Sequence, residues 1–228
     1  MLIHEGDSRT PRTDLMLASS LAFVAGGVNS AGFLAYKYFS ANMTGNVSMA
    51  SDHFAVFQFD LALGFLAIIV MFILGAFAAS LFIEFGRRRR RSNVYALTLI
   101  LEAALLILVG LVVALSPRAP NGVLIVGLLS FTMGIQNAAS TRISGSRVRT
   151  THVSGVATDL GVGLAILLGA SSNTDKLVIV QRLKLHLATI VFFALGGVLG
   201  VLGHQALGGV SFCVFAMPLI ILSVRYLK

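Results

Sequence analysis

Long apolar runs without charge alternate with short polar segments along the chain. Residues 15–36 and 61–83, for example, contain no Asp, Glu, Lys, Arg or His. About 20 apolar residues in a helix cross the hydrocarbon core of a bilayer, which is roughly 30 Å thick. The pattern predicts six transmembrane helices, over residues 15–37, 61–83, 94–115, 122–140, 187–207 and 208–225.

Two further apolar segments, 44–59 and 152–170, are shorter than the six predicted spans. Each opens with a polar cluster, Asn42–Asn46 in the first case and Thr151–Gly155 in the second. We expect both to form re-entrant or broken helices that start inside the membrane and return to the side they came from. From residue 154, the second is about 25 Å long as a helix, so the alternative for it is a helix that nearly crosses the membrane.

The distribution of basic residues supports this topology. If both short helices return, 15 of the 17 Lys and Arg residues fall on one side, and only Lys37 and Arg118 fall on the other. Basic residues concentrate on the cytoplasmic side of membrane proteins, which places both termini there. The fifteen are Arg9, Arg12, Arg87 to Arg91, Arg142, Arg147, Arg149, Lys176, Arg182, Lys184, Arg225 and Lys228.

Composition agrees with an all-α integral membrane protein. Of the 228 residues 57% are hydrophobic and 11% charged, whereas a soluble domain has about a quarter charged residues. The net charge of +8 would suggest nucleic acid binding in a soluble protein, but here the basic residues flank apolar spans. The single cysteine, Cys213, excludes a disulfide within the chain. Residues 1–14 are expected to form a flexible polar tail.

The two halves of the sequence resemble each other. Three collinear blocks recur at offsets of 108, 110 and 121 residues, which predicts one repeat over 15–115 and a second over 122–228. With three crossings each, the repeats have opposite orientations, as in many transporters. The matching positions are Phe23, Gly26, Asn29 and Ala31 with Phe131, Gly134, Asn137 and Ala139; Thr44, Gly45 and Ser48 with Ser154, Gly155 and Thr158; and Ile69, Val70, Phe72, Leu74 and Gly75 with Ile190, Val191, Phe193, Leu195 and Gly196.

Four motifs resemble the YoaK-like transmembrane family: residues 28–32 (VNSAG), 42–46 (NMTGN), 134–138 (GIQNA) and 148–155 (VRTTHVSG), the last followed by Thr158-Asp159. The resemblance covers nearly the whole chain. It implies a bacterial inner-membrane protein with about six spans. It supplies no substrate, cofactor or catalytic residue.

The polar clusters supply the first candidate site residues. Thr44 and Ser154 are natural N-caps of the two short helices, and Asn42 and Asn46 flank the first of them. If both helix starts reach the midplane, their free N–H groups favour an anion or the negative end of a polar solute. The alternative is that these residues only cap and pack two buried helices.

Buried polar residues within predicted spans form a second group. Asn29 and Asn137 occupy matching positions in the two repeats, and we expect them to brace the neighbouring helix starts rather than to contact a permeant. Glu102 lies in the middle of the span 94–115. It either carries a proton or bonds a polar group on a neighbouring helix.

His152, Thr158 and Asp159 complete the candidates. An acid within a membrane segment suggests function, and the helix dipole would keep Asp159 ionised. The alternative for Asp159 is an ion pair with Arg147 or Arg149 that anchors the preceding loop.

The sequence favours a small-solute or ion transporter or channel, with a sensor or scaffold as the alternative. An enzyme that uses His152, Ser154 and Asp159 is disfavoured, since residues two apart on a helix point to different faces. We therefore expect no catalytic residue. Metal-binding motifs are absent, and we expect no cofactor. Anionic lipid headgroups are expected at Arg87 to Arg91. A homo-oligomer is compatible with the sequence.

Overall fold

A computed structural model describes the chain except residues 1, 4, 119, 170–172, 225 and 228, and except the side chains of residues 7 and 173–175. Its described part is entirely helical, as predicted, and contains no strand. One short 3₁₀ helix, η1 (Gly6–Ser8), precedes eight α-helices. These are α1 (Pro11–Tyr36), α2 (Met43–Ala55), α3 (Phe59–Arg88), α4 (Val94–Leu115), α5 (Gly122–Ser144), α6 (Val153–Gly169), α7 (Asn173–Leu207) and α8 (Val210–Val224).

Five of these helices, α1, α3, α4, α5 and α7, are long and apolar enough to cross a membrane. The sixth predicted span forms α8, whose 15 residues extend about 22 Å. Large apolar side chains point outward along the bundle; Phe77 of α3 is 60% exposed and Val198 of α7 is 59% exposed. A surface of this kind suits lipid and not water, so the chain is a multi-pass membrane protein.

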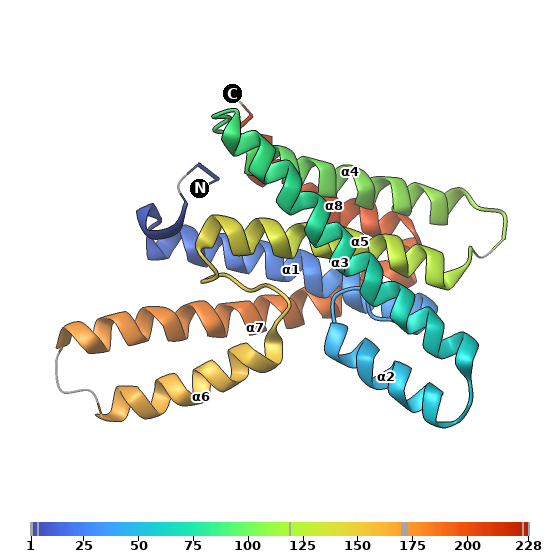
Figure 1. The fold of residues 1–228 in the computed structure, drawn as a ribbon, viewed down its shortest axis with the longest axis horizontal. Helices are drawn as coiled ribbons and strands as arrows, with labels where there is room; N and C mark the ends of the chain where they lie inside the picture. The colour runs from blue at the N-terminus through green and yellow to red at the C-terminus, as the bar shows by residue number, and fades with distance from the viewer. Residues whose placement is uncertain (1, 4, 119, 170–172, 225, 228) are drawn as a thin grey trace.

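The arrangement of the short helices follows the predicted topology (Figure 1). Both α2 and α6 begin near the middle of the molecule. From there α2 runs to the end where α1 finishes, and α6 runs to the opposite end, where α5 finishes. Each short helix therefore returns to the end from which the chain entered.

Both termini lie at the same end as the turn between α3 and α4 (Figure 1). Arg87 forms an ion pair of 3.4 Å with Glu5, and the Asn93 side chain donates to the Leu227 carbonyl over 3.5 Å. The basic run 87–91 is thus beside the two chain ends. Arg225 and Lys228, which we expect on this side, lie outside the described residues.

Two tight helix crossings hold the halves together, one between α1 and α7 and one between α3 and α5. Glycines in each crossing lack a side chain, which lets the backbones touch. The residues that meet occupy the matching positions found in the sequence. At four matching positions a Cβ would overlap a main-chain carbonyl: Gly26 on Phe193, Gly196 on Phe23, Gly134 on Phe72 and Gly75 on Phe131. In the α1–α7 crossing a Cβ at Gly200 would also overlap the Gly27 carbonyl.

Helix α7 begins 14 residues before the predicted start of its span. Lys176, Arg182 and Lys184, which we expect in a loop, lie instead on the first turns of this helix. Lys and Arg are good helix formers, so a charged segment continues a helix that hydropathy alone would end. The extension packs against α6.

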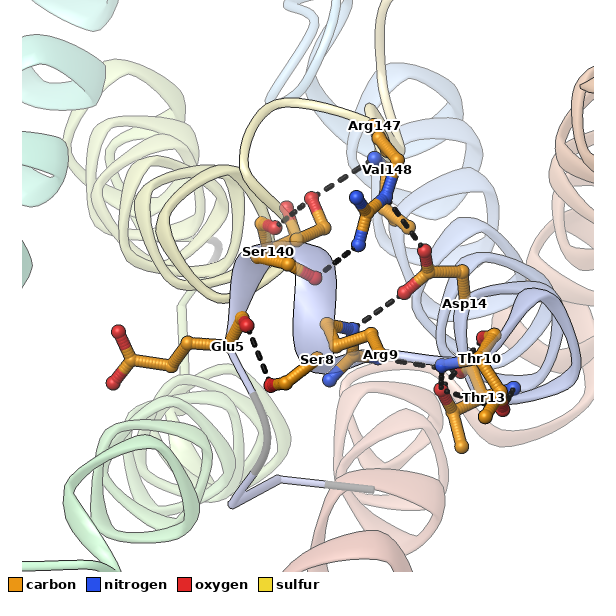
Figure 2. Close-up of polar contacts among 11 residues, drawn as sticks. Glu5, Ser8, Arg9, Thr10, Thr13, Asp14, Ser140, Arg147 and Val148 are labelled. Atoms are coloured by element: carbon orange, nitrogen blue, oxygen red, sulfur yellow. Dashed lines mark hydrogen bonds and ion pairs between the residues drawn. The ribbon is translucent and has the colours of Figure 1, made fainter.

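The N-terminal segment is not the flexible tail that we expect from its polarity. Helix α1 begins at Pro11 with Thr10 as N-cap, and Leu2 is buried. Arg9, also buried, bonds one carboxylate oxygen of Asp14, and Arg147 approaches the other at 3.0 Å (Figure 2). The two arginines neutralise a buried carboxylate, which fastens the chain start to the loop before α6.

Candidate functional site

A cavity of about 630 Å³ lies between the starts of the two short helices. Helix α2 and its preceding loop contribute one wall, and the loop before α6 contributes the other. Phe72 of α3 and Phe193 of α7, which occupy matching positions in the two halves, also line the cavity. The remaining lining residues are Asn29, Ala41, Asn42, Met43, Thr44, Gly45, Ser48, Thr151, His152, Val153 and Ser154.

At the start of α2, asparagine side chains hold the backbone in place. Asn42 is the N-cap, and its side chain accepts from the Gly45 N–H over 3.0 Å. Asn46 is fully buried and bonds both the carbonyl and the N–H of Phe39, at 2.7 and 3.3 Å. Thr44, which we expect as the cap, lies instead in the first turn and faces the cavity.

Asn29 of α1 also holds the loop before α2 in place. Its side-chain oxygen accepts from the Ala41 N–H over 2.9 Å. A buried backbone donor needs a partner, and this loop has no regular neighbour to supply one. Asn29 also lines the cavity, so both interpretations offered for it, brace and contact, are compatible with its position.

At the start of α6 the matching residue, Asn137, likewise braces the preceding loop. Its side-chain oxygen accepts from the Thr151 hydroxyl over 2.9 Å, and its amide donates to the Met133 carbonyl over 2.8 Å. Helix α6 begins at Val153, so Ser154, expected as its cap, lies in the first turn and lines the cavity. Asn137 is buried behind the cavity and does not line it.

Gln136, which lies beside Asn137, is not among the site residues predicted from the sequence. Gln136 is fully buried and donates to the Leu21 carbonyl of α1 over 3.0 Å and to the Thr150 hydroxyl over 3.2 Å. It thereby connects α5 and α1 to the loop before α6. The residue stands within the segment 134–138 that carries the family resemblance, so a signal was present.

The electrostatic character of the cavity comes from its helix ends. The first N–H groups of a helix have no partner within it, and here two such ends face one cavity. Among the described residues that line it there is no Asp, Glu, Lys or Arg, and His152 is titratable. The arrangement can donate hydrogen bonds to an anion or to the negative end of a polar solute.

Thr158 and Asp159 lie outside this cavity. The Thr158 hydroxyl donates to the Ser154 carbonyl over 3.2 Å, as Ser48 donates to the Thr44 carbonyl over 3.1 Å in the first half. Asp159 faces a second cavity between α6 and α7, where one of its oxygens is 4.0 Å from His186. The ion pairs found among the described residues do not include the alternative one, between Asp159 and Arg147 or Arg149; Arg147 bonds Asp14.

Glu102 lies in α4, away from both cavities, and is fully buried. Within the described part of the chain neither of its carboxylate oxygens has a hydrogen-bond partner. The polar neighbour that we expect for it is therefore not seen there. A metal-binding group of three or more His, Cys, Asp or Glu is likewise not found among the described residues.

Comparison with known families gives a match to a family model. The model of the family described as "Protein of unknown function (DUF1275)" matches residues 17–225. The chain belongs to the DUF1275 family. This agrees with the YoaK-like resemblance, and it covers both short helices and the cavity between them in this DUF1275 protein. Searches of curated proteins and of solved structures find no match.

Proposed function

We propose that this DUF1275 protein moves a small polar or anionic solute across the membrane, as a transporter or channel, by way of the cavity between α2 and α6. One observation carries the proposal: two helix starts from different halves of the chain open onto the same cavity. Broken helices whose N-termini meet near the midplane form solute sites in transporters.

The proposal treats the halves as inverted repeats. Two facts support this: α2 and α6 leave the cavity in opposite directions (Figure 1), and matching Gly and Phe residues form both crossings. A cavity between inverted halves is placed to open to either side by small movements of one half against the other. Phe72 and Phe193 would then lie on the two sides of the solute.

The lining favours a solute that accepts hydrogen bonds. Thr44, Ser48 and Ser154 add hydroxyl groups to the backbone donors, and the described lining includes no acid that would repel an anion. No basic side chain is present either, so a solute with a single negative charge or a neutral dipole fits better than a polyanion. His152 would add a positive charge if protonated.

We expect no catalysis. Asp159 lines a different cavity from His152 and Ser154, so these three residues do not assemble as nucleophile, base and orienting acid. We also propose that the chain resides in the inner membrane of a bacterium with both ends in the cytoplasm. The basic run Arg87 to Arg91 would then bind anionic headgroups.

A flux experiment tests the proposal. Proteoliposomes would be mixed with iso-osmolar glycerol, urea, nitrate or acetate, and volume changes followed by light scattering. We expect accelerated entry of at least one of these solutes, which Thr44→Phe and Ser154→Phe each abolish by filling the cavity. Val47→Phe, on an exposed position of α2, is the matched control and should keep the flux. A scaffold without transport would give no flux above protein-free liposomes for this panel or for a wider set of small solutes.

A further inference from the structure

A groove of about 220 Å³ lies between the end of α3 and the start of α4. Gly86 brings these helix ends close together, since a Cβ there would overlap the Val94 side chain. The lining combines apolar side chains with two arginines of the basic run: Phe82, Phe85, Gly86, Arg89, Arg91, Val94 and Leu97. The groove therefore has a charged part and an apolar part.

The arginines of the basic run differ in their partners. Arg87 forms the ion pair with Glu5 described above, and Arg88 forms one of 3.3 Å with Glu84. The two arginines of the groove are exposed, and within the described part of the chain neither has a carboxylate partner. Guanidinium groups bind phosphate oxygens through short, charge-assisted hydrogen bonds. The groove thus presents two guanidinium groups that can bind one phosphate.

The apolar residues of the groove lie deeper in the membrane than its arginines. Phe85 and Phe82 are about one and about two turns before the end of α3, and Leu97 is about one turn after the start of α4. Both helices are long and apolar enough to cross the membrane, and the arginines belong to the turn that joins them. The Phe85 side chain is 59% exposed and that of Phe82 is 42% exposed. A phosphate at the arginines would lie at the membrane surface, with an acyl chain running down along the two rings.

The second half of the chain shows that a helix pair of this kind does not require the charges. A groove of about 590 Å³ lies between α7 and α8, and its described lining contains no charged residue. The turn between α7 and α8 lies at the other end of the bundle, where Gly209 packs on Val113 near the end of α4. The basic groove is thus at the end that carries both chain termini (Figure 1). Basic pockets between membrane helices on the cytoplasmic side bind anionic headgroups.

We propose that this groove binds one anionic phospholipid of the cytoplasmic leaflet, with its phosphate at Arg89 and Arg91 and the upper part of an acyl chain along Phe82 and Phe85. The inference deepens the headgroup binding proposed above for the basic run and rests on the cytoplasmic position of that run, not on transport. Phosphatidylglycerol has the required chemistry, a phosphodiester with a net negative charge and two acyl chains. Phosphatidylcholine has the same chains without the net charge.

Native mass spectrometry of the purified full chain in mild detergent tests the charged part, with added phosphatidylglycerol or phosphatidylcholine. We expect phosphatidylglycerol to bind selectively, and Arg89→Gln with Arg91→Gln to weaken this binding about tenfold. Arg12→Gln with Lys184→Gln is the matched control, because it removes equal charge from exposed positions outside the groove. Helix content and melting temperature would show that both variants are folded.

A second pair of variants tests the apolar part. Phe85→Ala should weaken phosphatidylglycerol binding about threefold, because it removes apolar surface on which the acyl chain lies. Phe77→Ala is the matched control, since Phe77 is on the same helix and is 60% exposed, but it does not line the groove. This control should leave the binding unchanged.

The other outcomes overturn the proposal in distinguishable ways. If the arginine variant keeps the preference for phosphatidylglycerol, or if the two phenylalanine variants bind alike, the run attracts headgroups without this site. If the two lipids bind equally to the unmodified chain, headgroup binding by the run is rejected as well. If inorganic phosphate displaces phosphatidylglycerol at similar concentration, the arginines form a site for free anions. Binding in detergent is independent of solute flux, so none of these results decides whether the protein transports.

Discussion

The two short helices, α2 and α6, share a framework and differ in what surrounds them. Each starts at the central cavity, is braced by an asparagine at a matching position and has a first-turn hydroxyl facing the cavity. Beyond the first turn they diverge. Around α2, aromatic rings close the space, and burial raises the pKa of the Tyr38 phenol, which stays neutral. Around α6 the space is open and basic.

This difference separates what the fold needs from what is added to it. Glycines at the crossings and asparagines behind the helix starts occur in both halves, because each half packs its helices closely and must hold the loop before its short helix. The arginines that line the cavity beside α6, Arg147, Arg149 and Arg182, belong to the second half only. Variants that affect both halves alike test the shared framework, and variants that affect one half test the specialised part.

The largest effect is expected at the helix crossings. Gly26→Val and Gly134→Val would each drive a side chain into the carbonyl of a facing helix, Phe193 or Phe72. We expect a loss of stability of about 3 kcal/mol or more in both cases, since backbone cannot move aside as a side chain can. Thermal unfolding in detergent measures it. Gly161→Val has open space around it and is the control; similar damage from this variant would contradict the explanation.

The loops before α2 and α6 should differ in their dependence on charge. Asp14→Ala removes the buried carboxylate that both Arg9 and Arg147 bond, with an expected cost of about 3–5 kcal/mol. In the first half Lys37 lies 5.8 Å from the Phe33 ring on an exposed surface, so Lys37→Gln should cost about 1 kcal/mol or less. Equal losses in the two variants would show that the N-terminal ion pairs do not fasten the second loop.

The bracing asparagines should also differ, by a smaller amount. Asn29→Ala leaves the Ala41 N–H without a partner, at a cost of about 1–3 kcal/mol. Asn137→Ala leaves the Thr151 hydroxyl, which can rotate to another acceptor, so its cost should be lower. Unfolding midpoints in detergent compare them. A larger loss for Asn137→Ala would reverse our ranking of the two bonds.

Much of this architecture follows from short-range sequence patterns. Hydropathy predicts where most of the helices run, and several of the residues that meet at the crossings are ones that the repeat matches between the halves. Local ambiguity explains the misassigned caps: Asn42 and Thr44 are both good caps, and only the backbone geometry selects Asn42.

Contacts between distant residues could not be predicted in this way. Arg147 bonds Asp14, 133 positions away, whereas one hypothesis from the sequence paired the nearby Asp159 with Arg147 or Arg149. Charge spacing cannot reveal a pair that forms only after the N-terminal segment folds back on the bundle. The charged extension of α7 escapes detection for a related reason, since its contact with α6 exists only in the folded hairpin.

The central claim is that both helix starts face one water-accessible cavity. Its most direct test is thiol labelling of Thr44→Cys and Ser154→Cys in membranes, in a Cys213→Ser background that removes the native thiol. We predict that a small water-soluble methanethiosulfonate labels both positions, while the buried Val156→Cys and the outward-facing Leu164→Cys stay unlabelled. If Thr44→Cys and Ser154→Cys react no faster than those two controls, the cavity is not open to solute and the account is contradicted.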